Sequence, residues 1–89
     1  MAAAVVSARL AACAQVLGPV ASTYWWKGAV ERGAEWLCVM KTADARLPAL
    51  MKQIRSLHPY DQPEIVATPI VAGDPGYLDW ILTESEPSP

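Results

Sequence analysis

The chain has 89 residues, a length that supports a single domain. Its formal net charge is −2 and its seven Lys and Arg residues are scattered, which argues against a nucleic-acid partner. No apolar run approaches the roughly 18–20 residues that a membrane-spanning helix needs, so we expect a soluble, cytoplasmic protein. Hydrophobic residues make up 53% of the chain. Because so small a domain cannot hide that much apolar surface, we predict an interface between subunits.

The N-terminal region is rich in alanine and lacks Gly and Pro, which predicts a helix from Met1 to roughly Gln15. Four residues at near-helical spacing would form its buried stripe: Val6, Leu10, Cys13 and Leu17. Gly18-Pro19 would end the helix. Cys13 and Cys38 have no CxxC spacing, so the sequence favours buried free thiols and leaves one disulfide open.

A long antiparallel hairpin is predicted next. Residues 20–30 alternate in a β pattern rich in aromatics, with Gly28 marking a bulge or bend. A turn is expected at residues 31–34 and a second strand at residues 35–42. The run Trp36–Met40 is continuously apolar, which is typical of a central strand covered on both faces.

The clearest amphipathic helix follows the hairpin. Its apolar positions repeat at i, i+3, i+4 and i+7: Leu47, Leu50, Met51, Ile54 and Leu57. Asp44 is expected to be its N-cap, and Pro48 is tolerable in its first turn. The helix must stop at His58, because Pro59 disfavours helical geometry in the residue before it.

Residues 64–71 are dense in β-branched side chains and predict a third strand, which Pro63 and Pro69 confine to an edge or a bulge. A turn at residues 72–76 and a short closing helix from Tyr77 to Leu82 complete the chain. The order α-β-β-α-β-α is the split βαβ pattern of an α+β, ferredoxin-like sandwich. Such a fold has an antiparallel sheet with helices on one face, and here its first strand is missing.

Five stretches together resemble the CutA family of divalent-cation tolerance proteins. They are LAAC (Leu10–Cys13), YWWKG (Tyr24–Gly28), VMKT (Val39–Thr42), HPYDQPEI (His58–Ile65) and GDPGYLDWI (Gly73–Ile81). The match runs from about Val6 to Leu82, and the combination of YWWKG with HPYxxPE is specific. The chain is therefore similar to a single CutA-like domain over residues 1–89.

The resemblance implies a ferredoxin-like subunit of a tight, PII-like homotrimer, whose long hairpin pairs with neighbouring subunits. Family members begin with a strand and an acidic start of the first helix, and both are missing here. Either the start site is placed too late, or the chain is a fragment or a variant form. Unless another strand substitutes, the edge beside the Cys38 strand should stay unpaired, which costs stability and favours aggregation.

His58, the only histidine, is the one strong metal-ligand candidate, because neutral imidazole suits copper, zinc and nickel. In CutA proteins a histidine at this position is a copper ligand in a bacterial member. Its companions there are a first-strand cysteine and the residue before the histidine. Here that residue is Leu57, which cannot ligate, so no tightly bound copper or other divalent cation is expected. The favoured interpretation is that His58 bonds the last carbonyls of its helix.

The family resemblance also places Lys41, Tyr60 and Glu64 near clefts between subunits. Glu64 as general base with Lys41 as electrostatic clamp is one interpretation; an inter-subunit salt bridge with a Tyr60 hydroxyl bond is the favoured one. Four aromatic residues are expected to be interface anchors: Tyr24, Trp25, Trp26 and Trp80. Strand alternation puts Trp25 on the opposite face from its two neighbours.

No Gly-rich phosphate loop, Ser/His/Asp set or CxxC spacing is found, so the common enzyme signatures are absent. The leading hypothesis is a trimeric protein of divalent-metal tolerance, chiefly for copper, that acts by binding metal ions rather than by catalysis. The alternative is a PII-like signalling or interaction module that holds a small ligand or a partner at its inter-subunit clefts.

Overall fold

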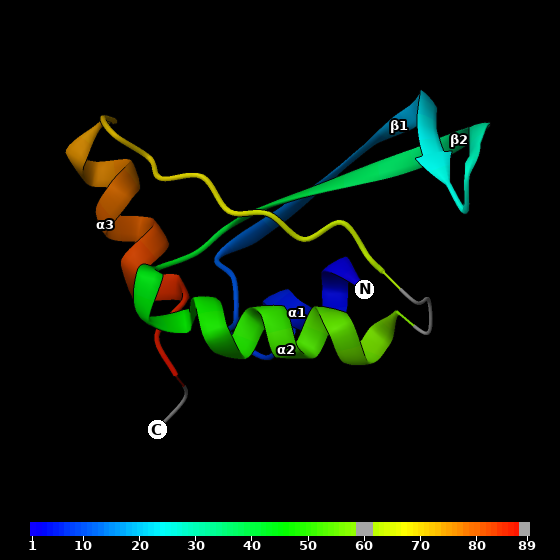
Figure 1. Ribbon diagram of the computed structural model, residues 1–89. Coiled ribbons are helices and arrows are strands. Elements are labelled where there is room, and N and C mark those ends of the chain that lie inside the picture. The colour runs from blue at the N-terminus through cyan, green and yellow to red at the C-terminus, as the bar shows by residue number, and fades with distance from the viewer. Residues whose placement is uncertain (59–61, 88–89) are drawn as a thin grey trace.

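The computed structural model describes residues 1–58 and 62–87. Its elements follow in the order α1 (Ala2–Ser7), β1 (Cys13–Trp26), β2 (Ala29–Lys41), a 3-10 turn (Asp44–Arg46), α2 (Leu47–Leu57) and α3 (Pro75–Glu84) (Figure 1). Helices α1 and α2 lie on one side of the β1–β2 hairpin, and α3 stands at its base. The expected α+β class is confirmed. Within the described ranges, no helix is long and apolar enough to cross a membrane.

The hairpin turns at Lys27-Gly28, where both residues have positive φ, +49° and +82°. Two consecutive positive φ angles define the tight turn that best matches the twist of paired strands, and glycine adopts the second one without strain. Trp26 therefore pairs with Ala29. The turn predicted at residues 31–34 is wrong: these residues lie within β2, in an exposed part of the strand.

The first helix is much shorter than predicted. It ends at Ser7, and Arg9 follows in the left-handed conformation, φ +58°. The amides of Arg9 and Leu10 donate to the carbonyls of Val6 and Val5, each at 3.0 Å. This is a Schellman motif, which closes a helix and turns the chain away. Glycine usually holds the left-handed position, so an arginine there leaves no visible stop signal.

A small core forms where α1 meets α2. Val5, Leu10, Ala11 and Leu50 are its buried members, and Val6, Met40 and Ile54 pack against them. Val5 and Leu10 are brought together by the Schellman motif, which commonly pairs apolar residues at these two positions. Because Cys13 therefore begins β1 instead of extending the helix, its place in a helical stripe was predicted wrongly.

The amphipathic helix is confirmed as α2, with Leu50 buried. His58 leaves the helix in an extended conformation, as its position before proline demands. Asp44 is not the N-cap: the 3-10 turn intervenes, and Arg46 occupies that place without a side-chain cap bond. The closing helix α3 begins earlier than predicted, because Asp74 caps it by accepting from the Tyr77 amide at 3.1 Å.

The third strand predicted at residues 64–71 does not form. Residues 62–73 instead run as an extended segment, which crosses the hairpin in Figure 1 (yellow). Within the described parts of the chain, this segment makes no backbone hydrogen bond. Among the described residues the sheet has two strands, so β2 is not the covered central strand that was expected, and Trp36 is 65% exposed.

Candidate functional site

The described residues form a groove of about 1940 Å³. Its walls are β2 from residue 34 to 41 and the extended segment from residue 62 to 70. Residues of β1 and apolar residues of the helices contribute to the rest of the lining, the helical ones including Leu47, Leu50, Ile54, Leu78 and Ile81. Large apolar grooves with a few polar groups are the usual places for ligands and partners. This groove is therefore the candidate site.

His58 lies on the lining of this groove and is half-buried. Its backbone amide donates to the Ile54 carbonyl at 3.2 Å, which places residue 58 at the carboxyl end of α2. Helix α2 exists because its apolar stripe packs on α1, so the core sets the position of the imidazole. In the described ranges 1–58 and 62–87, no three His, Cys, Asp or Glu side chains form a cluster that fits a metal ion.

Lys41 and Glu64 both line the groove, on opposite walls. The Lys41 ammonium donates to the side-chain oxygen of Gln15 on the paired strand, and its carbonyl accepts from the Ala12 amide at 2.8 Å. The only ion pair among the described side chains is that of Arg9 with Glu84. A Lys41–Glu64 bridge between subunits is still a prediction, and Tyr60 lies outside the described residues.

The aromatic residues fall into three places. Tyr24 and Trp26 line the groove, whereas Trp25 projects elsewhere and is 74% exposed. This matches the alternation expected of a strand. The Lys27 ammonium lies 5.6 Å from the ring centre of Trp26, within cation–π range. Trp80 is on α3, away from the groove lining, and stacks on Tyr77 with ring centres 5.7 Å apart.

Sequence reasoning missed the contact between Cys13 and Tyr77. Desolvation, followed by the neighbouring Cys13 thiol and its hydrogen bond, raises the pKa of the Tyr77 phenol above its ordinary value of 10.0. Both cysteines are free, as favoured, but only Cys13 is partly buried. Cys38 is exposed and lines the groove. Cys13 belongs to β1 and Tyr77 to α3, far apart in the sequence. No local pattern predicts that these two residues meet.

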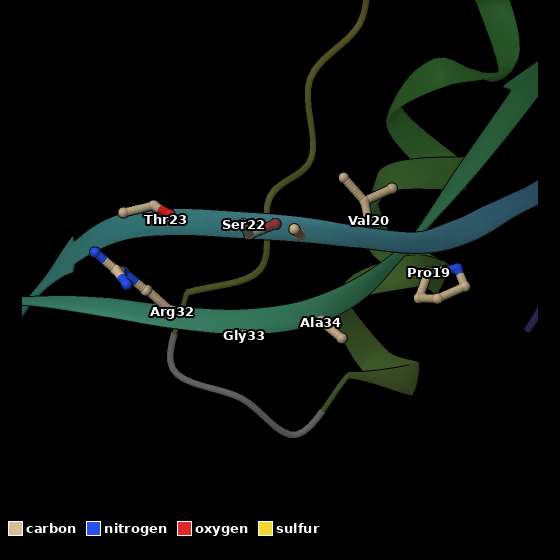
Figure 2. A pocket seen from close by; sticks show the side chains of 8 residues that line it. Pro19, Val20, Ser22, Thr23, Arg32, Gly33 and Ala34 are labelled. Atoms are coloured by element: carbon tan, nitrogen blue, oxygen red, sulfur yellow. The ribbon is translucent and has the colours of Figure 1, made fainter.

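A smaller hollow of about 440 Å³ lies along the middle of the hairpin (Figure 2). Residues 19–23 of β1 and 32–34 of β2 line it. Figure 2 shows the Arg32 and Thr23 side chains at one end and the small residues Gly33 and Ala34 beyond them. None of the residues singled out from the sequence contributes to it, so the larger groove is the better candidate.

Comparisons with known proteins agree with the architecture. The family described as CutA1 divalent ion tolerance protein matches residues 1–84. A mouse protein named CutA is 44% identical over 84 residues, which make up 92% of this chain and 48% of the mouse protein. The crystal structure of CutA from Xylella fastidiosa has a TM-score of 0.91 and 38% identity, and it covers 96% of this chain and 82% of that one.

The structure of the PII-like protein CutA from Nostoc, in its apo form, has a TM-score of 0.90 and 32% identity. That match covers 98% of this chain and 85% of the Nostoc chain. By contrast, the chain spans about half the length of the mouse, rice and human relatives, between 47% and 50%. The similarity therefore concerns the domain that these proteins share with this chain.

Proposed function

The chain belongs to the CutA1 family of divalent ion tolerance proteins. From this premise we propose that it serves divalent-cation tolerance, chiefly for copper. We propose that it does so by binding metal ions as a homotrimer rather than by catalysis. The observation that supports the proposal most directly is His58. Its imidazole is held at the rim of a large groove by a helix end, and imidazole is the protein ligand that best suits copper(II) at neutral pH. The cytoplasmic location expected from the sequence stays a prediction.

The residues that the structure describes in one protomer supply too few donors for a metal ion. Leu57 cannot ligate, and the described residues hold no second histidine, because the chain has only one. We propose that neighbouring subunits supply the further donors that a copper ion bound by His58 needs, which is why the metal proposal and the trimer proposal stand together. Site occupancy would then depend on assembly.

The trimer itself is supported by the apolar surface of the hairpin. Nine large hydrophobic side chains of β1 and β2 are exposed in the protomer: Val16, Leu17, Tyr24, Trp25, Trp26, Val30, Trp36, Leu37 and Val39. So many exposed large apolar side chains on one hairpin are unusual for a soluble monomer and typical of an interface. Light scattering at micromolar concentration is expected to give a mass near three times 9.6 kDa. A monomeric mass would contradict the proposal.

Titration of the purified protein with Cu(II) tests the metal site. We expect His58→Ala to weaken copper binding by at least about tenfold. Loss of a residue that supports a metal ligand already lowers metal affinity by that much, and loss of the ligand itself should lower it at least as far. Arg55→Ala, on the exposed face of the same helix, is the matched control and should bind copper like the parent. If His58→Ala and the parent are both trimeric and bind copper with equal affinity, then His58 is not a copper ligand.

The second candidate function is a PII-like interaction module in which the groove holds a small ligand or partner and metal effects are indirect. The size and largely apolar lining of the groove favour it, as does the similarity to a protein named PII-like. This candidate predicts that His58→Ala leaves copper binding unchanged. Substitution of groove residues such as Ile54 would instead alter ligand or partner binding.

A further inference from the structure

We draw no further inference here: the strongest candidate, the hollow of about 440 Å³ along the middle of the β1–β2 hairpin, lies on the arm already proposed as the interface between subunits, and nothing among the described residues shows what covers it.

Discussion

The indole of Trp36 lies directly on Gly18, across a bulge in the hairpin. A Cβ atom at Gly18 would stand 2.6 Å from Cε3 and 2.8 Å from Cδ2 of that ring. The bulge arises because Gly18 and Pro19 together oppose the single residue Trp36, between the pairs Leu17–Leu37 and Val20–Glu35. The absence of a side chain at residue 18 is therefore what lets the ring lie flat on β1.

Gly18→Ala is expected to displace the Trp36 ring and lower the free energy of unfolding by about 1 to 3 kcal/mol, since overpacked contacts of this kind cost that much. Gly33→Ala is the matched control in the same hairpin, because its nearest side-chain atom would be 4.0 Å away. Urea denaturation of both variants measures the difference. If the two variants are equally stable, the ring moves aside freely.

Arg9 has two opposed effects on the stability of the fold. Its positive φ strains a residue with a side chain, whereas its guanidinium pairs with the Glu84 carboxylate at 3.3 Å. The pair is exposed to 42% and 41%, so it contributes little. We expect Arg9→Gly to be more stable than Arg9→Ala by about 1 kcal/mol, because both lose the ion pair and only glycine relieves the backbone. Thermal unfolding of the two variants checks this, and the reverse order would show that the Schellman turn is not strained.

The sequence predicted those parts of the fold that local chemistry determines. Helix α2 was readable from its apolar spacing, and its end at His58 from Pro59, because proline acts on the adjacent residue alone. The extended character of residues 64–71 was also readable, but a strand exists only when a neighbour pairs with it. The end of α1 was hidden because arginine, not glycine, adopts the left-handed turn at residue 9.

In the candidate site, too, residue types could be predicted from the sequence, whereas contacts between distant residues could not. His58, Lys41 and Glu64 could be singled out by residue type, and they do share one groove. Gln15 as the partner of Lys41 depends on the strand register, in which Cys13 pairs with Lys41. That register follows from the Lys27-Gly28 turn together with the one-residue bulge at Gly18-Pro19. The sequence pattern placed the turn four residues too late.

Tyr77 is expected to ionise at a higher pH than a free tyrosine. Its raised pKa means that the folded protein holds the phenol proton more tightly. The corresponding stabilisation is present below the ordinary pKa of about 10 and is lost as the pH rises through the raised value. The ultraviolet absorbance of tyrosinate, as the difference between the parent and Tyr77→Phe, measures this titration. Cys13→Ala should shift it toward pH 10, and Cys38→Ala should leave it unchanged.

Two serine hydroxyls donate to a preceding helix carbonyl in different surroundings. The Ser85 hydroxyl donates to the Ile81 carbonyl at 2.6 Å and is fully buried, whereas the Ser56 hydroxyl donates to the Gln53 carbonyl at 2.7 Å in an exposed turn. Ser85→Ala should lower the free energy of unfolding by about 1 kcal/mol, because water cannot replace the buried bond. Ser56→Ala should be neutral or slightly stabilising, since alanine favours helix and water replaces the hydroxyl. Urea denaturation of the two variants gives the comparison, and a cost at Ser56 equal to that at Ser85 would rule out burial as the cause.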